Sequence, residues 1–497
     1  MFKNFPGYSL LEKIQKKKSH TRERKLPINA IKLIFIVAIT SVIALLPTES
    51  FGIEGLTVIH QRIISLFVFA ALMWLTEAMP SWVTSMVVVT VMLLTVSTSA
   101  FNFLRPEDGA GLVPFKSIMA CFANPTIMLF IGGFVLAIGL TKVKLDVALA
   151  RVLLKPFGTR SEVVLLGFIL VTAIFSAFVS NTETAAMMLA FLTPVLKSLP
   201  ADGKGRIALA LAIPVGANLG GMITPIGTPP NMIALDYLSS QGMGISFVDW
   251  TIKMAPFVIV LLVLSWMLLR FLFPFKQKHI KIEIEGDIKW NRHTWSVVAA
   301  FVITIFMWMF GTDLWGVDTN VVAMIPIAIF CATGILTRRD LEEINWSVLW
   351  MVAGGFALGV ALNYKDASSV SLSSLIVNTV PFDNFSPLVV MILAGIICFG
   401  FSNFISHSAA TSLLVPVLGV VAGGLGASLE QYGGAQAMLV GIAIASSVSM
   451  ILPISTPPNA IAHSTGFIQQ KDMMKVGIII GLMGLALGYA MLIFIGF

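Results

Sequence analysis

Charged residues are scarce in this 497-residue chain, at 11% against 57% apolar residues. A soluble domain of ordinary composition carries about 25% charged residues. The deficit runs along the whole chain, which excludes both a soluble protein and a soluble protein with a single anchor. Since a membrane-spanning helix needs about 20 apolar residues, we expect one bundle of roughly ten or more helices.

Cysteine is also scarce, and its placement excludes two further classes of protein. The three cysteines, Cys121, Cys331 and Cys398, lie in apolar segments without CxxC spacing. A disulfide framework or a zinc site would need closer pairs, so core packing is the favoured interpretation.

Positive charge is concentrated at one end of the chain. Residues 3–25 hold eight Lys and Arg against two Glu, which supplies +6 of the net charge of +7. A basic segment before the first apolar helix is typical of a cytoplasmic amino terminus and suits anionic lipid. We therefore expect a multi-pass protein of the cell membrane, with the amino terminus cytoplasmic, rather than a nucleic-acid-binding protein.

Apolar runs predict eleven membrane crossings, which would place the carboxyl terminus outside. Two further apolar stretches, 162–198 and 386–424, have a polar interruption in the middle. Each is compatible with a re-entrant hairpin or with two full spans, and the positive-inside rule fits both. The predicted crossings are 30–47, 60–79, 82–98, 126–143, 206–226 with a continuation, 250–274, 294–311, 319–336, 345–363, 434–452 with a continuation, and 474–497.

Three pairs of segments recur in the same order along the chain, at offsets of 222, 226 and 228 residues. Because five predicted crossings separate equivalent points, the two halves run through the membrane in opposite directions, as in the inverted repeats of secondary transporters. The pairs are Gly132-Gly133-Phe134 with Gly354-Gly355-Phe356, Ser176 to Thr182 with Ser402 to Ser408, and Pro225 to Asn231 with Pro453 to Asn459.

The sequence thus predicts an all-α polytopic membrane protein with an internal repeat. Its expected parts are a basic cytoplasmic tail (1–28), a first transmembrane helix (29–59), a first repeat (60–275) with hairpin 162–198 and broken helix 206–245, a basic cytoplasmic linker (276–293), and a second repeat (294–497) with hairpin 386–424 and broken helix 434–466.

The polar interruptions carry the first chemical signal. Ser, Asn and Thr cap helix amino termini, so Ser180-Asn181-Thr182 predicts a helix start at membrane depth. Such a start presents unpaired N–H groups and the positive end of the helix dipole. The repeat brings Ser406-His407-Ser408 to the same depth from the other side, which suits an anion with two negative ends. Polar residues that only pack neighbouring helices are the alternative.

Two proline pairs carry the second signal. A proline removes a backbone donor and blocks the carbonyl four residues earlier, so Pro229-Pro230 and Pro457-Pro458 predict helix breaks with exposed carbonyls. Unwound carbonyls suit Na⁺. For Asn231 and Asn459 we expect a structural role, with each amide bonding the broken backbone.

The segments SNTETAAMML, TPIGTPPNMIA, SHSAATSLLVPV and STPPNAIAHSTG resemble the signature segments of the divalent anion:sodium symporter family, in both halves of the chain. The resemblance implies a carrier of dicarboxylates, citrate or sulfate rather than an enzyme. It also implies a homodimer with eleven spans and two re-entrant hairpins per protomer, in which a transport domain moves against a fixed scaffold as an elevator. No cofactor is implied beyond Na⁺ as a coupling ion.

The resemblance also implies the roles of individual residues. One Na⁺ site would use Ser176, Ser180, Asn181 and Gly227, and a second would use Ser402, Ile405 and Ser455 with position 407. The substrate-binding residues would be Ser180, Asn181, Thr182, Thr228, Pro229, Ser406, His407, Ser408, Thr456 and Pro457.

The second half departs from the family pattern at His407, where the aligned residue is Asn. A register on Ser402-Asn403-Phe404 keeps the Asn but breaks the repeat, so we prefer the first alignment. An imidazole is a poor Na⁺ ligand, and its charge can be offered to a carboxylate. We hypothesise a degenerate second Na⁺ site and exchange of dianions. A neutral His that donates a hydrogen bond while Na⁺ still binds is the alternative.

Other functions stay open on the sequence alone. The signature segments contain no Lys or Arg, which favours small dianions such as succinate, malate, fumarate or 2-oxoglutarate, with citrate and sulfate as alternatives. A membrane-embedded hydrolase would pair a serine with His407, and a channel would also use broken helices. Glu183 fits a capping box with Ser180 better than proton coupling.

Overall fold

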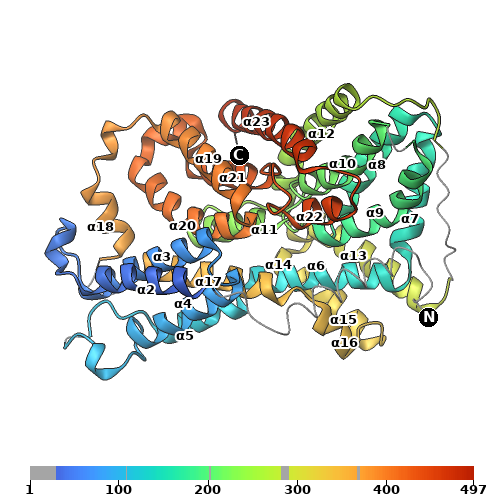
Figure 1. The fold of residues 1–497 in the computed structure, drawn as a ribbon. Coiled ribbons are helices and arrows are strands. Elements are labelled where there is room, and N and C mark those ends of the chain that lie inside the picture. Colours follow the sequence, from blue (N-terminus) through green and yellow to red (C-terminus); the bar gives the residue numbers. More distant parts are fainter. Residues whose placement is uncertain (1–28, 108, 201–202, 281–289, 366–369, 497) are drawn as a thin grey trace.

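The computed structural model consists of helices joined by turns and loops (Figure 1). The predicted basic tail 1–28 and residues 281–289 of the predicted linker lie outside the described part of the chain. Residues 29–107, 109–200, 203–280, 290–365 and 370–496 are described.

Helices of membrane-spanning length are abundant in the described residues. Eight are long and apolar enough to cross a membrane, including the two arms Pro387–Phe404 and His407–Tyr432 that the sequence assigned to one hairpin. Six further apolar helices are shorter. The structure therefore confirms a polytopic all-α protein, while eleven crossings stay a prediction.

The first half and the helix before it follow the predicted order closely. Its helices are α2 (Ala30–Leu45), α3 (Val58–Thr76), α4 (Ser81–Thr95), α5 (Phe115–Ala120), α6 (Pro125–Lys142), α7 (Leu145–Leu154), α8 (Ser161–Ser176), α9 (Asn181–Ser198), α10 (Gly205–Gly220), α11 (Pro229–Ser240) and α12 (Phe247–Leu272).

The second half repeats this order. Its helices are α13 (Arg292–Trp315), α14 (Thr319–Val322), α15 (Met324–Ala332), α16 (Arg338–Glu343), α17 (Trp346–Asn363), α18 (Leu372–Thr379), α19 (Pro387–Phe404), α20 (His407–Leu425), α21 (Gly434–Ser447), α22 (Pro457–Ser464) and α23 (Gln470–Phe494).

The helices form two layers, which lie one above the other in Figure 1. The scaffold layer contains α2 to α6 and α13 to α17. The hairpin layer contains α8 to α12 and α19 to α23, which pack mainly against one another. Helices α17 and α20 join the layers. Both predicted hairpins and both broken helices therefore belong to one layer, although they come from opposite halves of the chain.

The paired Gly-Gly-Phe segments allow close helix packing. A Cβ on Gly354 would lie 2.4 Å from Ser85 of α4, and one on Gly355 would lie 2.9 Å from Ser412 of α20. In the first half, a Cβ on Gly132 would lie 2.5 Å from the Ala323 carbonyl. Small residues let membrane helices approach in this way, so the repeated motif is a packing device.

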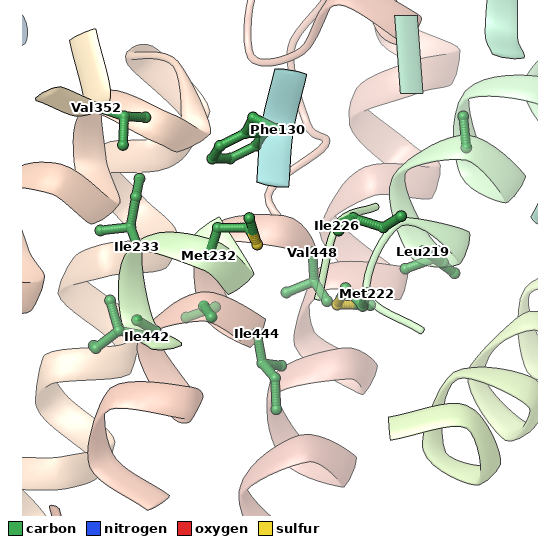
Figure 2. Packing of buried hydrophobic residues seen from close by; sticks show 14 of the residues in the cluster. Phe130, Leu219, Met222, Ile226, Met232, Ile233, Val352, Ile442, Ile444 and Val448 are labelled. Atoms are coloured by element: carbon green, nitrogen blue, oxygen red, sulfur yellow. The ribbon is translucent and has the colours of Figure 1, made fainter. Parts of the chain in front are cut away.

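Apolar side chains from both layers meet beside the helix breaks, as Figure 2 shows. Phe130 of α6 and Val352 of α17 belong to the same buried cluster as Met232 of α11 and Ile444 of α21. Large apolar residues such as Phe271 face outward, which suits a lipid environment.

The start of α2 and the turn between α3 and α4 lie on the same face of the molecule, because the Asn29 N–H donates to the Ala78 carbonyl at 2.9 Å. We call this the amino-terminal face. The turn between α16 and α17 borders the same cavity as the α3–α4 turn.

Candidate functional site

The two polar interruptions form the tips of two helical hairpins. Helix α9 begins after Ser180, whose Oγ accepts from the Glu183 N–H at 3.3 Å. Helix α20 begins after Ser406, whose Oγ accepts from the Ala409 N–H at 3.3 Å. Serine is thus the amino-terminal cap of both helices, as predicted, and the remaining first-turn N–H groups are available to an anion.

The predicted capping box at the first tip is only half formed. The serine side chain bonds to the Glu183 backbone, but no bond from the Ser180 N–H back to the Glu183 carboxylate occurs among the described residues. Glu183 therefore does not close the box as the sequence predicted.

Both proline pairs lie at the predicted helix breaks. Proline occupies the first two positions of α11 and of α22, where a missing N–H costs nothing. The Asn231 amide donates to the carbonyls of Gly221 and Thr224 at 3.0 and 2.8 Å. The Asn459 amide donates to the carbonyls of Met450 and Leu452 at 2.9 and 3.1 Å. Each asparagine holds its own break, as the sequence predicted.

The tips and the breaks meet in one cavity of about 390 Å³. The two arms of each pair, α8 with α9 and α19 with α20, pack against each other as helical hairpins. All ten predicted substrate-binding residues line this cavity, namely Ser180, Asn181, Thr182, Thr228, Pro229, Ser406, His407, Ser408, Thr456 and Pro457.

Oxygen atoms converge behind the first tip. The Asn181 Oδ1 accepts from Ser176 Oγ at 2.6 Å, and Ser176 Oγ also lies 2.7 Å from the Ala217 carbonyl. The terminal side-chain atom of Asn181 that contacts Ser176 Oγ also lies 3.0 Å from the Gly227 carbonyl oxygen and 3.2 Å from the Ala217 carbonyl oxygen. If the Asn181 oxygen faces these two carbonyls, a cation between the oxygens would stabilise them. If the carboxamide is rotated by 180°, its N–H group donates to the carbonyls instead.

The second tip is arranged differently. The His407 Nε2 lies 2.6 Å from the Ser449 carbonyl, so this nitrogen carries the proton and donates. The Ser455 hydroxyl donates to the Leu452 carbonyl at 2.8 Å. At the second tip, an imidazole N–H group therefore meets the Ser449 carbonyl.

The other residues predicted for the second Na⁺ site lie behind the tip. Ser402 Oγ bonds to Ser446 Oγ at 3.3 Å, and Ser446 Oγ donates to the His407 carbonyl at 2.9 Å. Ser402 and Ile405 are buried and do not line the cavity, and neither does Ser176 of the first site.

The structure also decides between the two registers considered for the second tip. Asn403 donates to the Phe399 carbonyl at 2.7 Å and accepts from the Ile451 N–H at 2.8 Å, away from the cavity. Its amide holds the backbone near the second break. His407 lines the cavity and is the residue that corresponds to Asn181.

Sequence reasoning missed the residues that the scaffold layer adds to the cavity. Glu77 and Asn345 line it from the α3–α4 and α16–α17 turns, and Ser81 and Ser347 line it from the first turns of α4 and α17. Glu77 is the one Asp, Glu, Lys or Arg side chain among the described lining residues, and burial raises its pKa while Lys32 opposes the rise. These turns lie outside the repeated motifs, so no sequence signal marked them.

Asn218, near the end of α10, was also missed. It lines the cavity and donates from Nδ2 to Asn459 Oδ1 at 3.0 Å, which joins the first broken helix to the second. A carboxamide in an otherwise apolar helix (IALALAIPVGANLG) was the available signal.

Comparison with known proteins agrees with this architecture. Residues 28–496 match the family model described as the sodium:sulfate symporter transmembrane region. An uncharacterized transporter of Haemophilus influenzae is 31% identical over 436 residues, covering 84% of this chain and 88% of that protein. The sodium-dependent dicarboxylate transporter SdcS of Staphylococcus saprophyticus is 28% identical, covering 85% of this chain and 83% of its own.

A solved structure supports the fold alone. The crystal structure of the Alcanivorax borkumensis YdaH transporter matches with a TM-score of 0.52 at 12% identity, covering 86% of this chain and 97% of that chain.

Proposed function

The chain belongs to the family of the sodium:sulfate symporter transmembrane region, and from this premise we propose that it carries small dicarboxylates across the membrane. The observation that supports this proposal is that the first turns of α9 and α20 face one cavity of about 390 Å³. Each helix amino terminus offers N–H groups and positive potential to one carboxylate. Hydroxyls of Thr182, Ser408 and Thr456 add neutral donors.

The absence of Lys and Arg from the described cavity lining favours a small flexible dianion. Helix ends and hydroxyls bind an anion less tightly than a bidentate Arg pair. Weak, distributed binding suits a carrier, which must release its substrate on the other side. Sulfate is a second candidate because the family model is named for it.

Coupling is proposed to differ between the tips. At the first tip, the oxygens around Asn181 support one Na⁺ site, and SdcS is described as sodium-dependent. At the second tip, the His407 N–H bonded to the Ser449 carbonyl takes the place of a cation. We therefore propose dicarboxylate exchange with a degenerate second Na⁺ site. Na⁺ symport through the first site alone is the second candidate.

An elevator motion of the hairpin layer is proposed as the mechanism. The site cavity reaches the amino-terminal face through the α3–α4 and α16–α17 turns, and a second cavity of about 1210 Å³ separates the same layers elsewhere. The second cavity is lined by Asn124, Asp236 and Asn363, and by neither hairpin tip. Two gaps between the layers, one with the site and one without, are what a sliding layer requires. A homodimer held through the scaffold completes the proposal.

Reconstitution into proteoliposomes tests the function. Vesicles loaded with unlabelled succinate, with equal Na⁺ on both sides of the membrane, are expected to accumulate labelled succinate without a Na⁺ gradient, whereas empty vesicles are not. Uptake that needs an inward Na⁺ gradient even in loaded vesicles would replace exchange by symport. No uptake of succinate, malate, citrate or sulfate under either condition would refute the transport proposal.

A further inference from the structure

One buried amide oxygen, on a residue that lines the cavity, has no partner among the described residues. Asn218 is 1% exposed and lines the site cavity, yet its Oδ1 accepts no hydrogen bond from any described residue. Leaving a buried acceptor unpaired is unfavourable, because the group loses its bond to water and gains none in return. In a transport site, such a group is expected to find its partner in the ligand.

The orientation of the Asn218 carboxamide follows from its neighbours. The Asn459 Nδ2 donates to the carbonyls of Met450 and Leu452, which leaves the Asn459 Oδ1 as an acceptor. Asn218 must therefore present its Nδ2 to Asn459, at 3.0 Å, and its oxygen elsewhere. Turning the carboxamide over would set two oxygens against each other.

The corresponding position of the second half has a bonded side chain instead of an unpaired oxygen. At an offset of 228, Asn218 corresponds to Ser446, whose hydroxyl donates to the His407 carbonyl at 2.9 Å. The second half therefore satisfies the same position within the protein, whereas the first half leaves an unpaired acceptor on a residue that lines the cavity. The asymmetry points to a ligand that brings its own donor.

We propose that Asn218 Oδ1 accepts a hydrogen bond from a hydroxyl of the transported anion, so that the site prefers dianions carrying an O–H donor over those without one. This inference rests on the proposed anion transport. The shared chemistry is an anion with an O–H group, as in a 2-hydroxydicarboxylate or hydrogen phosphate. A net hydrogen bond of about 0.5–1.5 kcal/mol corresponds to an about two- to tenfold preference.

Matched anions test the preference without any mutation. L-Malate and succinate differ by one hydroxyl, and hydrogen phosphate and sulfate differ in one O–H group at similar size. Isothermal titration of the purified full chain at saturating Na⁺ should give tighter binding of malate than of succinate, or of phosphate than of sulfate, by about two- to tenfold. The pair that shows the difference identifies the source of the hydroxyl.

The outcomes separate this inference from the proposed function. Equal or reversed affinities within both pairs would overturn the role of Asn218 and leave anion transport standing. Failure to bind any of the four anions would instead overturn the proposed function.

Substitution tests the residue itself. Asn218→Ala should lower the affinity for the hydroxylated anion more than that for its partner, so that their ratio falls to about one. An equal loss for both would mean that Asn218 only positions Asn459, which would overturn the proposal. Thr84→Val is the control, because Thr84 Oγ1 is also buried without a described partner but lies outside the cavity. That variant should keep the wild-type ratio.

Discussion

The two hairpin tips begin from the same repeated sequence and end with different chemistry. At the first, a carboxamide faces the Gly227 and Ala217 carbonyls and offers either its oxygen or its nitrogen to the space between them. At the second, the His407 Nε2 donates to a carbonyl at 2.6 Å. A carboxamide can present either an oxygen or an N–H group to these carbonyls, whereas the imidazole presents an N–H group. The comparison teaches that an inverted repeat can keep its backbone at both tips while the side chains that face the backbone carbonyls differ between the halves.

The difference extends to the residues behind the tips. Asn181 lies against Gly221, where a Cβ would come within 2.5 Å of its Oδ1. The corresponding residue of the second half, at an offset of 228, is Ser449. The first half thus has room for an inward amide, and the second half has replaced both the amide and the space that it needs.

The largest expected effect on Na⁺-dependent binding comes from removing the Asn181 carboxamide at the first tip. Asn181→Ala deletes the group that faces both carbonyls, and hydrogen bonds to charged groups contribute about 1.5–3 kcal/mol. We expect Na⁺-dependent succinate binding to weaken by about 10- to 100-fold. Calorimetric titration of succinate across a series of Na⁺ concentrations measures this. Unchanged Na⁺ dependence would show that the first tip holds no cation.

A methyl group at Gly221 should damage the same proposed site without replacing any of its ligands. Gly221→Ala places a Cβ 2.5 Å from Asn181 Oδ1, and overpacking costs about 1–3 kcal/mol. The apparent Na⁺ affinity should fall by about five- to a hundredfold. Gly423→Ala in α20 is the matched control, because a Cβ there meets nothing within 4 Å. Equal effects of the two variants would contradict the packing argument.

The converse experiment gives the second tip the residues that the first tip has at the corresponding positions. His407→Asn with Ser449→Gly restores both the carboxamide and the space beside it. The double variant should steepen the Na⁺ dependence of succinate binding by about one further ion, and His407→Asn alone should do so less. The coupling between the two substitutions is measured as a double-mutant cycle. Additive effects would show that the residue at position 449 does not control the amide.

Much of this site could be predicted from the sequence, because its elements are local. Serine caps and proline pairs act within one helical turn, so the tips at Ser180 and Ser406 and the breaks at Thr228 and Thr456 were located correctly. The repeat then indicated that they would meet. The positions of His407 and Asn403 relative to the cavity also followed from the preferred register.

What could not be predicted depends on contacts between distant segments. The scaffold residues Glu77 and Asn345 reach the cavity through turns that carry no repeated motif. The Asn218–Asn459 bond joins helices 241 residues apart in the chain. The direction of the His407 ring depends on a carbonyl 42 residues away. Such pairings depend on how the layers pack, and no periodicity encodes them.

The smallest expected effect concerns the two asparagines that hold the breaks. Asn459 donates to two carbonyls and accepts from Asn218, whereas Asn231 donates to two carbonyls and its Oδ1 has no described partner. Asn459 Nδ2 also lies 3.4 Å from Ser455 Oγ. Asn459→Ala therefore loses two more hydrogen bonds than Asn231→Ala. It should destabilise the protein by about 0.5–1.5 kcal/mol more.

Thermal unfolding of both variants in the same detergent measures this order, with the lower midpoint expected for Asn459→Ala. Adding Asn218→Ala to each variant is the internal control. It should cost less in the Asn459→Ala background, where the Asn218 amide has already lost its acceptor, than in the Asn231→Ala background. Equal costs in both backgrounds would mean that the bond between the two broken helices contributes nothing to stability, and that the two breaks are held independently.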